Sequence, residues 1–186
     1  MDNDSQNIEF KRFISREYYS KDLALEYLSK SCANVSEAMQ LVFEGKHPDA
    51  WRSAYMLAFY FNSQPKSVKP YIHDIIDYVK IAKPDGLQRE LLRMIMFAGF
   101  NEDYAGKVVD LCFSLWEPVK KQASVRMIAL KILVQYSDYY PELKPELLVI
   151  TEHDGFQNRH GAKHSKDLIR NKLIRDCKKL KLNINY

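Results

Sequence analysis

The sequence predicts an all-α fold built from consecutive pairs of helices, and three observations support this fold class. Six glycines and seven prolines in 186 residues are too few for a turn-rich β-sandwich or barrel. No stretch shows the sustained period-two alternation of a half-buried strand. Pro48, Pro84 and Pro118 precede long helical patterns at intervals of 36 and 34 residues, which is the spacing of a stacked two-helix unit. We therefore expect a right-handed α-solenoid of about nine helices, formed by a single domain over residues 1–186.

The first predicted pair covers residues 23–33 and 35–44. Asn34 precedes the second of these helices and Glu37 follows three residues later, which is the spacing of a capping box. Gly45 comes where this helix should end.

The second predicted pair covers residues 50–61 and 71–81, and Pro70 opens its second helix. Residues 54–61 are apolar almost all round, so we expect neighbours to cover this helix on more than one side. The second helix repeats its apolar residues on one face: Ile72, Ile75, Ile76 and Val79.

The rest of the chain repeats apolar residues every three or four positions, which predicts helices over 87–97, 101–115, 119–136, 145–152 and 164–181. Gly99 ends one of these helices, and Asn101 caps the next. The last helix is apolar on one stripe and basic elsewhere, as is typical of a terminal capping helix.

Residues 52–59 read RSAYMLAF, an arginine followed by small residues that let neighbouring helices approach closely. Together with residues 109–113, 125–133 and 139–147, this segment resembles a family of short bacterial HEAT-like proteins of unassigned function. The resemblance extends over roughly residues 45–175. It implies a HEAT-type (armadillo-like) α-solenoid, and its motifs specify fold rather than chemistry.

The sequence lacks the motifs of two activities that are associated with this resemblance. Some family members carry an automatic adenylosuccinate lyase label, but the S-S-x-M-P-x-K-x-N loop of that superfamily is absent from the sequence. HEAT-like DNA glycosylases place an Asp one turn after a Trp, whereas Trp51 and Trp116 are followed at that distance by Tyr55 and Lys120. No catalytic constellation is found, and we expect no enzymatic activity.

The formal net charge is +4, and the basic residues concentrate between residues 159 and 181. Phosphate contacts by Lys and Arg dominate nucleic-acid affinity, so this segment is a candidate anion or nucleic-acid contact. Its candidate residues are Lys163, Lys166, Arg170, Lys172, Arg175 and Lys179. The alternative interpretation is a solvated capping helix.

Two further groups of polar residues are candidates for chemistry. His73, Asp74 and Asp77 share the outer side of their helix, where they are possible groove contacts or, alternatively, an ordinary solvated face. His160 and His164 lie one turn apart near His153 and Asp154, but no third ligand lies on the same helix, so we expect no metal and no cofactor.

Several features indicate a cytoplasmic protein. The three cysteines at 32, 112 and 177 are odd in number and contain no C-x-x-C pair, as expected in a reducing compartment. The longest apolar run is 54–61, far shorter than the ~20 residues that cross a bilayer. Residues 1–7 are polar and acidic, so we expect a polar N-terminal segment rather than a signal peptide.

The favoured hypothesis is a non-catalytic scaffold that binds a protein or peptide along the groove lined by the second helix of each pair. The first alternative is a nucleic-acid-binding protein that uses the basic C-terminal helix. The second is an uncharacterised enzyme. The sequence identifies neither the partner nor the oligomeric state.

Overall fold

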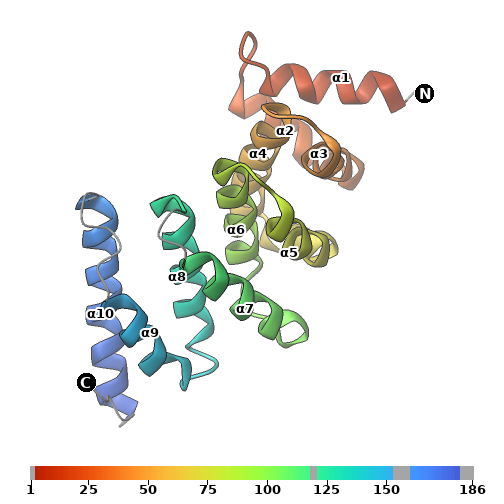
Figure 1. Cartoon of the computed structure of the whole chain (residues 1–186). Coiled ribbons are helices and arrows are strands. Elements are labelled where there is room, and N and C mark those ends of the chain that lie inside the picture. Colours follow the sequence, from red (N-terminus) through yellow and green to blue (C-terminus); the bar gives the residue numbers. More distant parts are fainter. Residues whose placement is uncertain (1–2, 118–120, 153–159, 181–186) are drawn as a thin grey trace. The chain divides into compact units, whose positions relative to one another are not determined.

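The computed structural model describes residues 3–117, 121–152 and 160–180, and these are mostly helical, without a strand (Figure 1). The chain divides into two compact units, residues 1–98 and 99–186. The first unit contains α1 (Asn3–Ile14), α2 (Lys21–Lys30), α3 (Cys32–Glu44), α4 (Asp49–Ser63), the 3₁₀ helix η1 (Pro65–Tyr71), α5 (Ile72–Ile81) and α6 (Asp85–Ala98). The second contains the 3₁₀ helix η2 (Glu102–Tyr104), α7 (Ala105–Trp116), α8 (Ala123–Tyr136), α9 (Leu143–Glu152) and α10 (His160–Leu180).

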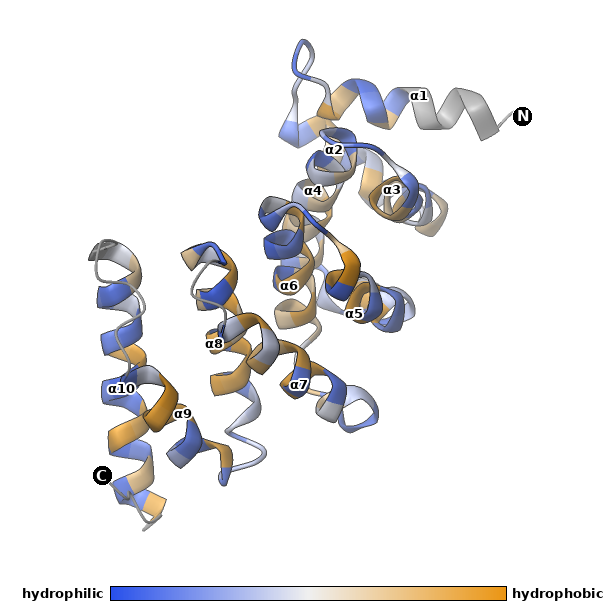
Figure 2. Cartoon of the chain, in the orientation of Figure 1, coloured by the Kyte–Doolittle hydropathy of each residue, from blue (hydrophilic) through white to orange (hydrophobic). Residues whose placement is uncertain are grey.

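The first unit is built from helix pairs, as predicted. Helix α4 packs against both α2 and α6, so these three helices lie side by side in one layer (Figure 1). Helix α3 packs on α2 and α4, and α5 packs on α6, which forms the second layer. Figure 2 shows apolar residues on the facing sides of these helices, where the core forms.

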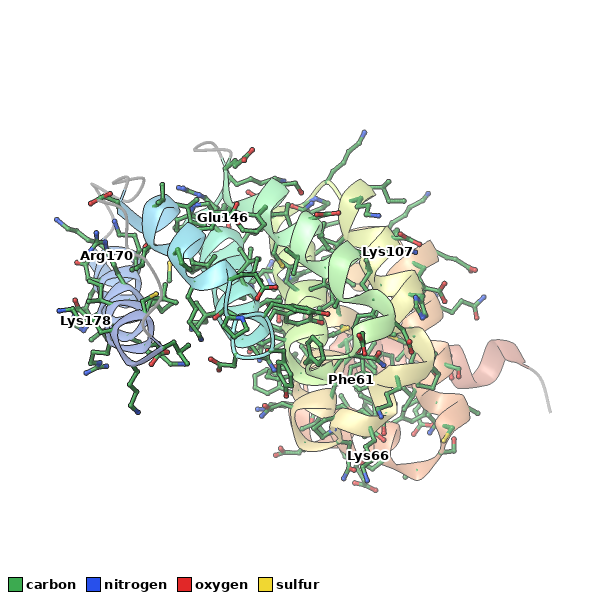
Figure 3. The ribbon with its side chains drawn as sticks, turned by 90° about the horizontal axis from the view of Figure 1, so that it is seen from below. Phe61, Lys66, Lys107, Glu146, Arg170 and Lys178 are labelled. Atoms are coloured by element: carbon green, nitrogen blue, oxygen red, sulfur yellow. The ribbon has the colours of Figure 1, made fainter. Side chains whose placement is uncertain are left out.

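Helix α4 is buried on several sides, which confirms the prediction from its apolar sequence. Met56, Leu57 and Phe61 are fully buried, and Figure 3 shows Phe61 inside this unit. Complete burial of a side chain of this size stabilises a fold by about 1.5–3 kcal/mol. The hydroxyl of the buried Ser53 donates a hydrogen bond of 2.7 Å to the carbonyl oxygen of Ala38, which joins α4 to α3.

The cap of α3 differs from the prediction. Ser31, not Asn34, is the N-cap, and its hydroxyl accepts a 3.2 Å hydrogen bond from the backbone N–H of Asn34. The Asn34 side chain instead donates to the carbonyl oxygen of Tyr27, and Glu37 accepts a hydrogen bond from the Tyr27 hydroxyl. Asn34 and Glu37 therefore join α3 to α2. Gly45 ends α3 as predicted.

The polar N-terminal segment predicted over about residues 1–7 overlaps a helix that the apolar periodicity did not predict, since α1 begins at Asn3. This helix brings the number of α-helices in the described residues to ten rather than nine. Phe10 and Ile14, one turn apart, are both buried, and the Phe10 ring stacks on Tyr27 with centroids 5.6 Å apart. Among the described side chains, Phe13 also contacts Tyr27, with ring centroids 6.2 Å apart, and such scattered apolar positions give a weak sequence signal.

The second unit is organised around α8, which packs against α7, α9 and α10. The guanidinium group of the buried Arg126 donates to the carbonyl oxygen of Trp116 at 2.7 Å and lies 4.8 Å from the centroid of its ring. Gly99 has a φ of 76°, a left-handed conformation that favours glycine. Asn101 caps η2, just before α7. Residues 118–120 lie outside the described residues, and α8 begins at Ala123 instead of residue 119.

The C-terminal helix α10 begins at His160, four residues before its predicted start. The expected apolar stripe of this helix was Ile169, Leu173, Cys177 and Leu180, and the structure buries Leu173 and Cys177 but leaves Ile169 partly exposed and Leu180 50% exposed. Within the described residues, no helix is both long enough and apolar enough to cross a membrane.

Candidate functional site

Three aromatic side chains, Trp51, Tyr55 and Phe59, follow one face of α4 in the first unit at intervals of four residues, so successive rings meet along the helix. His47, in the turn before α4, stacks on Trp51 and continues the line, and we call these four residues the α4 aromatic row. The ring centroids are 6.4, 6.1 and 4.9 Å apart in order from His47 to Phe59. None of the four rings is fully buried.

A cavity of about 420 Å³ opens beside this row, and we call it the Trp51 pocket. Its lining comes from the α1–α2 connection and from two turns of α4: Ser15, Arg16, Tyr19, Trp51, Arg52, Tyr55 and Met56. Met56 is fully buried, whereas Tyr19 is 52% exposed. The pocket therefore has an apolar interior and an aromatic, cationic edge.

Local hydrogen bonds hold the α1–α2 connection in place. The Ser15 hydroxyl donates to the carbonyl oxygen of Arg12 and accepts from the backbone N–H of Tyr18. The backbone N–H of Ser20 donates to the carbonyl oxygen of Phe13, and the Ser20 hydroxyl caps α2. These turns fix the backbone from which Arg16 and Tyr19 extend to the pocket.

The two arginines of the pocket differ from Arg89 and Arg93 on the same face. In the part of the chain that the structure describes, neither the Arg16 nor the Arg52 guanidinium group has an ion-pair partner. By contrast, Arg89 and Arg93 bind the buried carboxylate of Glu90 at 2.8 and 2.6 Å. Arg16 and Arg52 therefore give the pocket edge a positive charge that no carboxylate of the described chain neutralises.

The end of the row near Phe59 is also cationic. The Lys21 ammonium lies 3.6 Å from the centroid of the Phe59 ring, and the Arg93 guanidinium lies 5.1 Å from it. These are cation–π contacts, which hold the two cations against the ring.

A second cavity of about 270 Å³ shares Trp51 with the first. It is lined by Gly45, His47, Ala50, Trp51, Tyr78, Ile81, Ala82, Lys83, Pro84 and Leu87. The indole N–H of Trp51 is buried without a hydrogen-bond partner among the described residues. A Cβ at Gly86 would lie 3.2 Å from this nitrogen, so glycine at this position leaves room for the indole.

The residues His73, Asp74 and Asp77 are exposed on α5, and neither cavity includes them. Asp77 forms an exposed ion pair with Lys80 at 3.1 Å. A groove-contact role for these three residues stays a prediction.

The basic candidate residues on α10 differ in their exposure and in their partners. Lys163, Lys172, Arg175 and Lys179 are exposed, whereas Lys166 is only 4% exposed and faces the interior. Arg170 is held by Glu152 at 3.1 Å. Figure 3 shows Arg170 and Lys178 along this helix. The register of α10 directs Lys166 inward. This lysine is therefore too buried to contact an anion or a nucleic acid.

Sequence reasoning missed a buried ammonium group next to this helix. Lys144 is 3% exposed, and its Nζ lies 2.7 Å from a carboxylate oxygen of Asp138 and 3.8 Å from one of Asp176. It also donates to the hydroxyl of Ser137. A lysine just before a predicted helix gives no sign of burial, so no sequence signal pointed to this network.

The Trp51 pocket is equipped for binding. Its lining supplies aromatic rings, a thioether, three hydroxyl groups and two guanidinium groups, but no carboxylate or imidazole for acid–base chemistry. Among the described residues, no group of three or more His, Cys, Asp or Glu side chains is placed to hold a metal ion. His153 and Asp154, which the sequence placed near His160 and His164, lie outside the described residues.

Helix pairs that stack on their neighbours define the class of α-helical repeat proteins. The family model described as HEAT repeat domain matches residues 16–166, and the chain therefore belongs to the HEAT repeat family. No curated protein and no solved structure matches the chain significantly. The family match confirms the resemblance that the sequence carries, and it covers almost all of the Trp51 pocket.

Proposed function

We propose that this HEAT repeat protein is a non-catalytic scaffold that binds a segment of a protein partner in the Trp51 pocket. The observation that carries the proposal is the composition of the lining, in which Trp51, Tyr55, Tyr19, Arg16 and Arg52 surround an apolar floor. Trp, Tyr and Arg are the residue types that supply most of the binding energy in protein interfaces.

The size of the pocket supports a peptide segment as the occupant. Its volume of about 420 Å³ lies at the lower end of the ~300–1,000 Å³ range of ligand pockets. A few side chains of an extended segment fit this space. Burying one large apolar side chain against the pocket rings favours binding by about 1.5–3 kcal/mol.

The proposed site lies on α4, the first helix of its pair, rather than along the second helices. The exposed His73 and Asp77 on α5 are therefore suitable controls.

A single domain over residues 1–186 and a cytoplasmic location fit this proposal, and both remain predictions.

Site-specific photo-crosslinking tests the proposed function. A photoreactive phenylalanine, p-benzoylphenylalanine, replaces Tyr55, and matched proteins carry it in place of Asp77 on α5 or Lys178 on α10. The proteins are irradiated in an extract of the source organism, and adducts are identified by mass spectrometry. We expect a discrete protein adduct from position 55 and none from position 77. Equal labelling at positions 55 and 77, or no protein adduct at position 55, contradicts the proposal.

A nucleic-acid-binding role remains a second candidate, because Lys172, Arg175, Lys178 and Lys179 are exposed on α10. It predicts that labelled RNA or DNA binds at low salt with an affinity that falls steeply as ionic strength rises. Substitution of Arg175 and Lys179 by Glu should then weaken binding. Binding that is absent, or unaffected by salt, rejects this candidate.

A further inference from the structure

We propose that the occupant of the Trp51 pocket is an acidic peptide segment. An aromatic or long aliphatic side chain of the segment packs against Trp51 and Tyr55, and a neighbouring carboxylate binds Arg16 and Arg52. This inference rests on the proposed function and adds the chemical class of the partner.

The positive charge at the pocket edge favours a partner segment that carries a carboxylate. Arg16 and Arg52 line the same cavity, and within the described chain neither has an ion-pair partner. Glu17 and Asp49, which are close to them in sequence, form no ion pair with either arginine among the described residues. A carboxylate supplied by a partner would give both guanidinium groups a counter-charge. Guanidinium binds carboxylate through paired, charge-assisted hydrogen bonds.

Arg89 and Arg93, the arginines at the Phe59 end of the row, already have a counter-charge. Arg89 and Arg93 bind Glu90, whereas Lys21 lies over Phe59. The partner's carboxylate should therefore bind at the end of the row near Arg52 and Arg16 rather than near Phe59.

The apolar floor and the rings of the pocket favour a partner segment with an aromatic or long aliphatic side chain. Met56 is fully buried beneath the cavity, and Trp51 and Tyr55 present partly exposed rings beside it. A small polar side chain would leave this surface wet, whereas an aromatic or long aliphatic side chain would bury it.

The length of the row sets the length of the segment. Trp51 and Phe59 are eight residues apart on α4, which corresponds to roughly 12 Å along a helix, and the His47 ring lies a further 6.4 Å from Trp51. An extended peptide advances about 3.3 Å per residue, so about five residues cover the row. We expect the acidic residue within three positions of the apolar anchor.

Peptide selection on the full-length protein tests this inference. A displayed library of random 12-residue peptides is selected against the wild type, the charge-reversal variant R16E/R52E and the control variant R175E/K179E. We expect wild-type and control selections to enrich Asp or Glu within three positions of an aromatic or long aliphatic residue. The R16E/R52E selection should lose this enrichment. Selected peptides should bind R16E/R52E at least tenfold more weakly than the control.

Further variants separate a failed fold from a failed site. The neutral variant R16Q/R52Q should weaken peptide binding in the same direction, and the thermal unfolding of each variant is measured alongside. The variant Y55A identifies which selected peptides occupy the pocket, because these should lose binding when the ring is removed.

The possible outcomes distinguish this inference from the proposed function. Peptides that require Tyr55 but show no acidic enrichment and bind R16E/R52E normally overturn the inference and leave the proposed function intact. A selection without any Tyr55-dependent peptide overturns the proposed function. If an oligodeoxythymidine displaces the selected peptides from the pocket and binds more tightly, the acidic-peptide inference is also wrong.

Discussion

The rings of Trp51 and Tyr55 lie one helical turn apart on α4, with centroids separated by 6.1 Å and planes inclined by 37°. Both rings line the Trp51 pocket, together with Arg16 and Tyr19 from the α1–α2 connection. Residues that are distant in sequence thus line one pocket, and the substitutions and conditions below test this pocket and the stability of both units.

Tyr55→Ala should reduce partner or peptide binding at least tenfold while lowering the free energy of unfolding by only about 1–2 kcal/mol. The ring is partly exposed, so its removal creates less of a cavity than the loss of a buried aromatic residue. Binding titration and urea unfolding measure the two effects. An equal loss of binding in Tyr139→Ala, which removes a 58% exposed ring in the other unit, would show that the effect is not specific to the pocket.

Glu90→Gln should lower the free energy of unfolding by about 2 kcal/mol. Its carboxylate is 1% exposed and binds both Arg89 and Arg93, so the amide would leave two partly buried cations without their counter-charge. Urea unfolding at neutral pH measures the loss. The matched control is Asp77→Asn, which breaks an exposed ion pair with Lys80 and should cost less than about 0.5 kcal/mol. Similar losses in both variants would contradict this explanation.

Two glycines of the second unit should respond oppositely to alanine. Gly99 has a φ of 76°, so Gly99→Ala should destabilise the protein by about 1–2 kcal/mol. At Gly106, within the first turn of α7, a Cβ would meet nothing within 4 Å, so Gly106→Ala should stabilise by up to about 0.5–1 kcal/mol. Thermal or urea unfolding compares them, and a destabilised Gly106→Ala would contradict the prediction.

Stability should fall at alkaline pH, in part because of Tyr27. Burial, followed by the hydrogen bond to Glu37, raises the pKa of Tyr27 above its ordinary value of 10.0. The folded state therefore favours the neutral phenol. This contribution is fully present below pH 10.0 and is lost as the pH rises toward the raised pKa.

The variant Tyr27→Phe isolates this contribution. It lacks the hydrogen bond to Glu37 and should be less stable near neutral pH by about 1 kcal/mol. Its stability should also depend less on pH between about 9 and 11 than that of the wild type, because one titrating group is missing. Urea unfolding at several pH values measures both slopes, and identical slopes would exclude Tyr27 as a source of the alkaline loss.

The sequence predicts most of the fold because helix periodicity and local end signals are short-range properties. Gly45 and Asn101 were placed correctly for this reason. Asn34 was not, because Ser31, three residues earlier, offers an equivalent capping oxygen and the side chain of Asn34 is used between helices instead. The handedness of the solenoid remains a prediction.

The candidate site was harder to predict than the fold. The spacing of His47, Trp51, Tyr55 and Phe59 is visible in the sequence, but in a helix that is apolar almost all round it does not distinguish a partly exposed row from core. The contribution of Arg16 depends on how a polar connection docks on α4, which local sequence does not encode. Lys166 was expected to be an exposed contact because it is a lysine, but it is buried, because burial follows from packing rather than from residue type.

The central claim is that the Trp51 pocket is where a partner binds, and tryptophan fluorescence tests it most directly. The sequence contains two tryptophans, so Trp116→Phe leaves Trp51 as the only one, and Trp51→Phe leaves the buried Trp116 as a matched control. We predict that a crosslinked partner or selected peptide shifts Trp51 emission to shorter wavelength and reduces its quenching by acrylamide, with no change in the control. Saturating partner that leaves Trp51 emission and quenching unchanged would contradict the account.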